Sequence, residues 1–178
     1  MIFHNLDKSI QKEVEELFTS VFYDSEGEAE GELIGKLSSQ LASNIDDNEI
    51  FGCGAYESEA LIGSCFFSRL RVSEPVQLFM LSPVAVKTDL QGKKIGQGLI
   101  NYGLEELKKR SCQVVVTYGD PAYYSKVGFQ PLTQGVIQSP HNLSMPHGWL
   151  GQSLTEGPIP TIKERPVTVK EFNNPLFW

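Results

Sequence analysis

The sequence predicts an α/β (α+β) fold: a mixed central sheet, largely antiparallel with one parallel βαβ unit, flanked by helices. Three strand-like segments follow one another with short turns, which is typical of an antiparallel meander. An amphipathic helix then leads into a short, almost wholly apolar run, which is typical of a buried strand parallel to its neighbour. The chain has 178 residues, of which 40% are hydrophobic and 21% charged, so we expect a single domain over residues 1–178.

The N-terminal part predicts two helices. Apolar residues at helical spacing mark the first: Ile10, Val14, Leu17, Phe18, Val21 and Phe22. Asp7 stands where an N-cap residue is expected. The acidic stretch 23–32 should run from a loop into a second helix, because Gly27 and Gly31 weaken its opening turns. Leu33, Ile34, Leu37 and Leu41 form the apolar face of that helix.

Three strands are predicted at residues 50–57, 60–72 and 76–86. Pro83 lies inside the third strand. Since proline has no N–H to donate to the ladder, that point must be a bulge or an unpaired edge. An interrupted strand of this kind offers its backbone to a ligand.

The βαβ unit comes next. Its helix is predicted at residues 95–110 and its strand at 114–118, with a right-handed crossover. A short helix follows at residues 122–127, and one or two further strands are expected in the Gly- and Pro-rich remainder.

Charge and composition exclude several classes of protein. The net charge is −7, with 14 acidic and 3 basic side chains in residues 1–60 but 6 basic and 3 acidic ones in residues 87–110. Such a chain is a poor nucleic-acid binder, although the basic region suits one small polyanion. The three cysteines are too few and too dispersed for a disulfide scaffold or a zinc site, so we expect no metal. Without an apolar run of membrane length or a secretory signal, the protein is predicted to be cytoplasmic.

The segment Gln91–Gly98 reads QGKKIGQG and lies between a predicted strand and a helix. The free N–H groups of a helix N-terminus, glycines and two lysines together favour a pyrophosphate cradle. A tight turn that needs glycine only for its backbone angles is the alternative. The segment lacks the Gly-Lys-Ser/Thr of a Walker loop and the third glycine of a dinucleotide fingerprint.

Two motifs resemble the GNAT superfamily of N-acetyltransferases. LSPVAV at residues 81–86 with QGKKIGQGLI at 91–100 is similar to motif A, and GDPAYYSKVGF at 119–129 is similar to the later motif of a bacterial "predicted acetyltransferase" subgroup. The resemblance covers residues 3–132, and residues 134–178 would be a C-terminal extension of the same domain. It implies a GNAT acyl-CoA N-acyltransferase fold and an enzyme that transfers an acetyl group from acetyl-CoA.

The resemblance also implies site residues. The pantetheine arm of acetyl-CoA would pair with the backbone of Val84, Ala85 and Val86. Cofactor-binding residues in the pyrophosphate loop would be Gln91, Gly92, Lys93, Lys94, Ile95, Gly96 and Gln97. Lys94 departs from the family pattern, because it stands where the first glycine belongs.

Tyr124 matches a family tyrosine that contacts the cofactor and protonates the leaving thiolate. For the general base we expect Glu28, with Glu32 and Asp120 as alternatives. Tyr123 and Cys65 are expected in the core.

The predicted function is an N-acetyltransferase that acts on a primary amine of a small molecule or peptide, by direct attack in a ternary complex. The alternative is a non-catalytic acyl-CoA-binding sensor or interaction module with the same fold. An unrelated phosphate-ligand binder is a third reading. The apolar segment 172–178 either covers the core or mediates a homodimer, which we expect.

Overall fold

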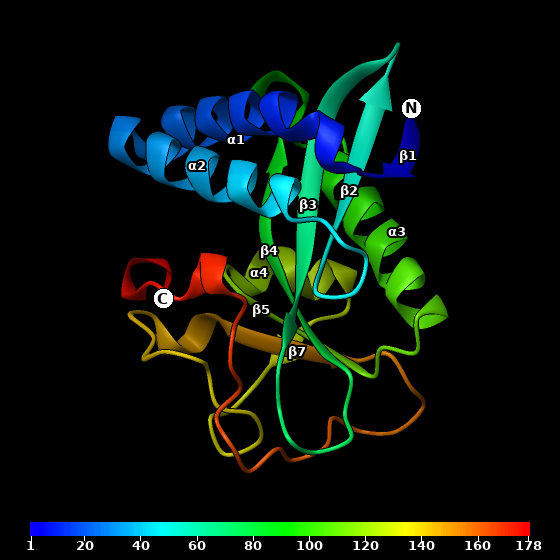
Figure 1. Cartoon of the computed structure of the whole chain (residues 1–178), viewed down its shortest axis with the longest axis vertical. Coiled ribbons are helices and arrows are strands. Elements are labelled where there is room, and N and C mark those ends of the chain that lie inside the picture. The colour runs from blue at the N-terminus through cyan, green and yellow to red at the C-terminus, as the bar shows by residue number, and fades with distance from the viewer. The chain divides into compact units, whose positions relative to one another are not determined.

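Seven strands form one mixed sheet in the order β1-β2-β3-β4-β5-β7-β6 in the computed structural model, which describes residues 1–178 (Figure 1). The strands are β1 (Ile2–Asn5), β2 (Ile50–Glu57), β3 (Ala60–Leu70), β4 (Leu78–Val86), β5 (Val114–Tyr118), β6 (Gln130–Pro131) and β7 (Trp149–Ser153). The helices are α1 (Gln11–Glu26), α2 (Glu28–Ser43), α3 (Ile95–Lys109) and α4 (Pro121–Tyr124). No helix is long and apolar enough to cross a lipid bilayer.

The chain divides into two compact units, which we describe separately. The first contains residues 1–67 and 83–103, and the second contains residues 68–82 and 104–178. The expectation of a single domain over the whole chain stays a prediction.

In the first unit, β3 places large side chains alternately on the two faces of the sheet, and both faces are buried. Phe66 packs toward α1, with its ring 6.1 Å from that of Phe18. Phe67 points to the opposite face, where it stacks on Phe51 at 5.2 Å and lies against Gly103 of α3. All four phenylalanines are fully buried, and they form the core that fixes the helices on the sheet.

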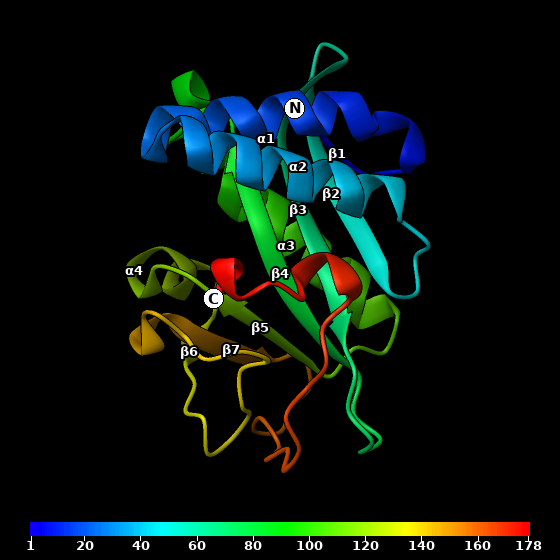
Figure 2. The same cartoon turned by 60° about the vertical axis from the view of Figure 1, so that its left-hand side comes forward.

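The helices α1 and α2 lie side by side in both views, connected by the single residue Gly27 (Figures 1 and 2). Gly31 of α2 makes this close approach possible. A Cβ atom added there would lie 2.8 Å from the backbone oxygen of Thr19 and 3.0 Å from the backbone nitrogen of Tyr23. At Gly35 an added Cβ would overlap Thr19 as well. These glycines therefore serve helix packing, although they lower intrinsic helix propensity.

In the second unit β4 pairs with β5 in parallel, from Leu78 opposite Val114 to Leu81 opposite Thr117. β5 then pairs antiparallel with β7. The C-terminal segment packs on this unit: Trp178 is buried, stacks on Tyr118 and donates its indole N–H to the carbonyl oxygen of Phe172 at 3.0 Å. Of the two roles expected for residues 172–178, covering the core is therefore observed.

The predicted elements are present, with three differences. Strand β1 was not predicted, because a four-residue edge strand with mostly exposed side chains has no distinct pattern. The acidic stretch was expected to begin as a loop, but it is helical on both sides of Gly27, since packing between the helices outweighs glycine propensity. β3 ends at Leu70 and β4 begins at Leu78, so the loop between them is longer than expected.

Replacing Gly31 with alanine should destabilise the protein. The backbone of α1 cannot move away from the new Cβ without disturbing the helix pair, so we expect a loss of about 1–2 kcal/mol after the gain in helix propensity. That loss corresponds to a fall in Tm of roughly 2–8 °C in thermal unfolding. Gly157→Ala is the matched control, because no atom lies within 4 Å of its added Cβ. Equal Tm values for the two variants would contradict close helix packing at Gly31.

Candidate functional site

Strand β4 contains a bulge at Pro83, which is shown by the directions of three hydrogen bonds. The carbonyl oxygens of Gln77 and Leu81 both face β5, where they accept from the Val114 N–H at 3.2 Å and the Thr117 hydroxyl at 2.8 Å. The Lys87 N–H faces β3 instead and donates to the Ile62 carbonyl oxygen at 2.9 Å. In a regular strand these odd-numbered residues would all face the same neighbour. The reversal requires an irregular residue between Leu81 and Lys87, as Pro83 predicts.

Beyond the bulge, the backbone of Val84 and Val86 lies at an edge that no strand pairs with. Residues of even number beyond the bulge direct their N–H and C=O groups away from β3, while the β4–β5 register already ends at Leu81. Ala85 alternates with them and directs its carbonyl oxygen toward Gly63 of β3. The Val86 carbonyl oxygen accepts a hydrogen bond from the side chain of Gln91 at 3.1 Å. Gln91 thus ties the following loop to the end of the strand.

The loop from Gln91 to Lys94 is exposed and leads directly into α3. The first helical hydrogen bond is donated by the Gly98 N–H to the Lys94 carbonyl oxygen at 3.0 Å. The N–H groups of Ile95, Gly96 and Gln97 therefore have no carbonyl partner inside the helix. These donors lie at the positive end of the helix dipole, beside the ammonium groups of Lys93 and Lys94, which suits a phosphate or pyrophosphate group.

Lys94 occupies a backbone conformation that favours glycine. Its φ is 63°, and that of Gly92 is 79°. In the left-handed region the Cβ of an ordinary residue crowds the backbone at a cost of about 1–2 kcal/mol. The loop therefore keeps the geometry of a glycine at residue 94 even though the side chain is lysine.

Tyr124 lies in the second unit, at the end of α4. The centroid of its ring lies 5.1 Å from that of Tyr123 and 5.8 Å from that of Phe129, both in edge contacts. The ring also packs against Gly119, where a Cβ atom would overlap it. Tyr123 was expected in the core but is only half-buried, as is Tyr124. A four-residue helix has no inward face that would bury one of two adjacent rings completely.

The side chain of Asp120 is used for capping. Its Oδ1 accepts the Ala122 N–H at 2.9 Å and begins α4, with Pro121 in the first turn. Asp120 is therefore the N-cap residue of α4.

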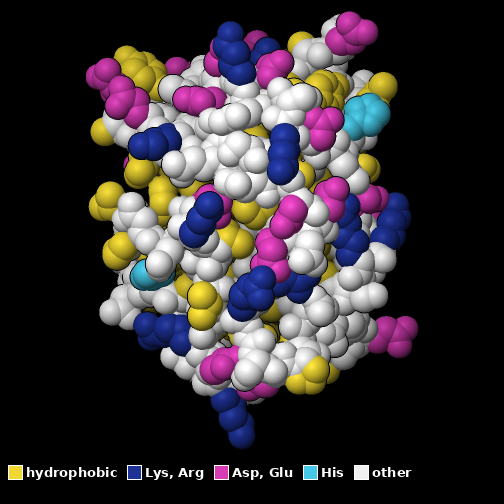
Figure 3. All heavy atoms as spheres, in the orientation of Figure 1, with side chains coloured by type: hydrophobic (Ala, Val, Ile, Leu, Met, Phe, Trp, Pro, Cys, Tyr) yellow, Lys and Arg dark blue, Asp and Glu magenta, His cyan; other side chains and the backbone are white.

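Acidic side chains gather where α1 meets α2, at the upper left of Figure 3. Glu28 is exposed in the first turn of α2, and Glu32 is exposed one turn later. Glu30, between them, was not considered from the sequence. Partial burial raises the pKa of Glu30, and the nearby charge of Glu26 raises it further. A carboxylate with a raised pKa is a stronger base. Because the pKa of Glu30 is raised by burial, the sequence alone does not indicate it.

The three cysteines are free and buried. Complete burial raises the pKa of the Cys65 thiol, with a further contribution from Cys53. Burial also raises the pKa of Cys112 to about 12. Cys65 and Cys112 are therefore poor candidates for a nucleophile, because only the thiolate attacks. No group of three or more His, Cys, Asp or Glu side chains is arranged to hold a metal ion.

Residues 11–129 match the sequence model described as the acetyltransferase (GNAT) family. The Escherichia coli K12 protein named uncharacterized N-acetyltransferase YjhQ is 32% identical over 111 residues, which are 58% of this chain and 60% of that protein. The uncharacterized N-acetyltransferase YhbS of the same strain is 37% identical over 71 residues, 39% of this chain and 42% of that protein. The chain thus matches three fifths or less of the length of these relatives.

Solved structures share the fold. The Escherichia coli YhbS structure in complex with CoA has a TM-score of 0.82 at 22% identity, covering 97% of this chain and 92% of that one. A GNAT family acetyltransferase from Brucella melitensis in complex with acetyl-CoA has a TM-score of 0.68 at 20% identity, covering 97% and 99%.

Lys94→Gly should stabilise the protein, whereas Lys94→Ala should not. Glycine removes the crowded Cβ at positive φ, so we expect a gain of about 1 kcal/mol, or roughly 2–4 °C in Tm. Alanine removes the same charge but keeps the Cβ, which makes it the matched control. If both variants had the same Tm, the strain assigned to Lys94 would be absent.

The cysteines should not react in the native protein. At pH 8 the pKa of about 12 for Cys112 leaves very little thiolate. We expect Ellman's reagent to detect no thiol until a denaturant is added and then to detect the three cysteines. A fast-reacting thiol in the native state would show that one cysteine is accessible and ionised.

Proposed function

Because the chain belongs to the acetyltransferase (GNAT) family, we propose that it is an N-acetyltransferase that moves an acetyl group from acetyl-CoA to a primary amine. The acceptor would be a small molecule or a peptide, attacking directly in a ternary complex. One observation carries the proposal. Residues 84–97 provide a free strand edge followed at once by a helix N-terminus, the two backbone features that a pantetheine arm and a pyrophosphate require.

The backbone edge and the loop would share the binding of acetyl-CoA, whose thioester supplies an activated acyl group. Val84 and Val86 would pair with the pantetheine amides, while the carbonyl oxygen of Ala85 between them lies toward Gly63 of β3. The N–H groups of Ile95, Gly96 and Gln97 would bind the pyrophosphate, and Lys93 and Lys94 would add positive charge. Gly92 leaves open space over the loop, with no atom within 4 Å of an added Cβ. Gln91 would hold the loop in place through Val86.

Two side chains would move the protons. The attacking amine must lose a proton, and we assign this role to Glu28 at the start of α2. Glu30, whose pKa is raised by burial, is the alternative base. The departing thiolate must gain a proton, which the phenol of Tyr124 would donate. The edge contacts with Tyr123 and Phe129 would hold the Tyr124 ring in place.

A bacterial cytoplasmic location and a homodimer complete the proposal. Sedimentation equilibrium tests the dimer: a mass near 40 kDa is expected, twice the 19.8 kDa of the chain. A mass near that of one chain at micromolar concentration would refute it.

A thermal-shift measurement with acetyl-CoA, CoA, NAD and ATP in parallel tests the binding step. A ligand at a hundred times its Kd stabilises by about 2.7 kcal/mol, which is roughly 5–11 °C for a chain of this size. We expect this shift with acetyl-CoA and CoA alone. No shift with either would overturn the proposal. If acetyl-CoA and CoA raise the Tm but no tested amine accelerates the release of CoA, the result would instead support a non-catalytic acyl-CoA-binding module.

Tyr124→Phe should lower kcat at least tenfold while leaving the Kd for CoA unchanged. The phenylalanine keeps the ring contacts and removes only the hydroxyl group, so the loss would report proton donation. Tyr123→Phe is the matched control and should retain kcat. An unchanged kcat in Tyr124→Phe would remove this residue from the mechanism.

A further inference from the structure

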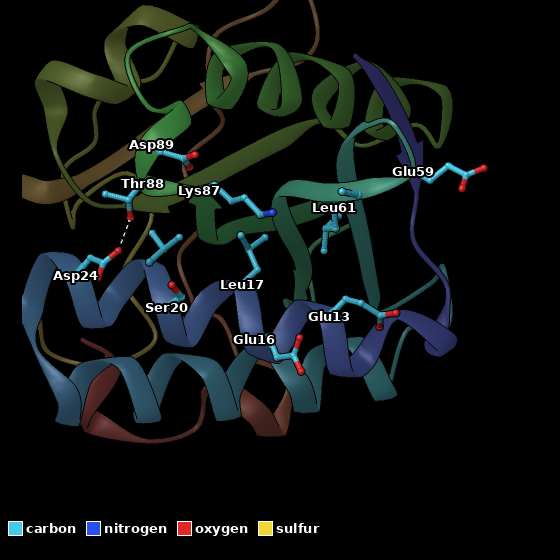
Figure 4. A pocket seen from close by; sticks show the side chains of 12 residues that line it. Glu13, Glu16, Leu17, Ser20, Asp24, Glu59, Leu61, Lys87, Thr88 and Asp89 are labelled. Carbon is cyan, nitrogen blue, oxygen red and sulfur yellow. Dashed lines mark hydrogen bonds between the residues drawn. The ribbon is translucent and has the colours of Figure 1, made fainter.

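A pocket of about 620 Å³ lies within the first unit, between α1, the beginning of β3 and the residues that follow β4 (Figure 4). Its volume is in the range of pockets that bind small molecules. Its lining includes none of the residues assigned above to acetyl-CoA or to proton transfer. The pocket is therefore a feature that the proposed reaction does not use.

The inner surface of this pocket is apolar. Leu17 and Val21 of α1 and Leu61 of β3 contribute side chains that are nearly buried. The hydroxyl groups of Ser20 and Thr88 stand beside them. Thr88 donates to Asp24 at 2.7 Å, which connects α1 to the segment after β4 at one end of the pocket (Figure 4). A hydrocarbon chain would find a contact surface here.

The rim of the pocket is strongly acidic. Its carboxylates belong to Glu13, Glu16, Asp24, Glu59 and Asp89, against a single ammonium group, that of Lys87. Lys87 extends into the pocket, whereas Glu59 points outward (Figure 4). Glu16 also has Lys12 at 3.9 Å, but both side chains are largely exposed, so this pair neutralises little. The pocket therefore favours a ligand with net positive charge.

The acidic groups are spread out rather than clustered. Glu13 and Asp24 are eleven residues apart on one helix, which is about 16 Å along its axis. No three carboxylates of the protein are placed to share a metal ion. A ligand that meets several of them must therefore be long, with positive charges separated by apolar segments that can lie on Leu17 and Leu61.

We propose that this pocket binds an elongated organic polycation, of the chemistry of a linear polyamine, at a site separate from the acetyl-transfer site. Its ammonium groups meet the carboxylates of Glu13, Asp24 and Asp89, and its methylene segments cover the apolar surface between them. Lys87 opposes binding, since it is the one positive charge that extends into the pocket.

Isothermal titration calorimetry with spermine as the probe tests the site, at low salt and without acetyl-CoA. Glu13→Gln should weaken binding about fivefold and Lys87→Gln should tighten it by about the same factor, because each variant changes one charge near the ligand. Glu156→Gln removes an exposed charge outside the pocket and should leave the Kd unchanged. A glycol of similar length, which has no charge, should not bind.

Three results would overturn the proposal. Spermine could fail to bind, or Glu156→Gln could weaken binding as much as Glu13→Gln, which would indicate general attraction to an acidic protein. Weakening by Glu28→Gln but not by Glu13→Gln would place spermine at the transfer site instead. Thermal unfolding of each variant checks that it is folded. Because no acetyl-CoA is present, failure here is distinct from failure of the proposed transferase activity.

Discussion

The reversal of hydrogen-bond direction within β4 is the constraint on which the candidate site depends. Before Pro83 the strand offers its odd-numbered carbonyl groups to β5, and beyond it the Lys87 N–H turns to β3. The buried hydroxyl of Thr117 donates to the Leu81 carbonyl oxygen at the end of the parallel register, so both of these groups are paired. Beyond this point, the even-numbered residues have an edge that no strand covers. Such an edge presents N–H and C=O groups with which an extended ligand can pair, which makes it a natural place for a substrate.

Two glycines in α2 and one lysine before α3 stand where their residue types are unfavourable. In α2, Gly31 and Gly35 stand inside a helix, where glycine is unfavourable, because the neighbouring helix leaves no room for a Cβ. At the start of α3, Lys94 stands at a positive φ where glycine would be favourable. In α2, close packing between the helices outweighs the low helix propensity of glycine. At Lys94 the chain keeps an ammonium group beside the free N–H groups of a helix N-terminus and accepts backbone strain in return.

The basic and the acidic side chains of the chain lie on distinct surfaces. The basic residues of the loop before α3 adjoin free N–H groups, where both features favour an anion. Two groups of acidic residues are distinct, one at the junction of α1 and α2 and the other around the apolar pocket beside α1. The first group adjoins the assigned base, and the second has an apolar surface of its own. Net charge alone does not distinguish these surfaces, because it carries no information about which carboxylates share a pocket.

The sequence by itself determined the order and type of nearly all elements, because hydrophobic periodicity and turn residues are local signals. It also predicted a bulge or an unpaired edge at Pro83, since the missing N–H of proline is a property of one residue. The tertiary structure alone decided which backbone groups are free, because the direction of a carbonyl depends on the partner strands. It also decided that Tyr123 is only half-buried and that the pKa of Glu30 is raised. These properties arise from contacts between residues distant in sequence or from burial, and no local pattern of residues encodes either.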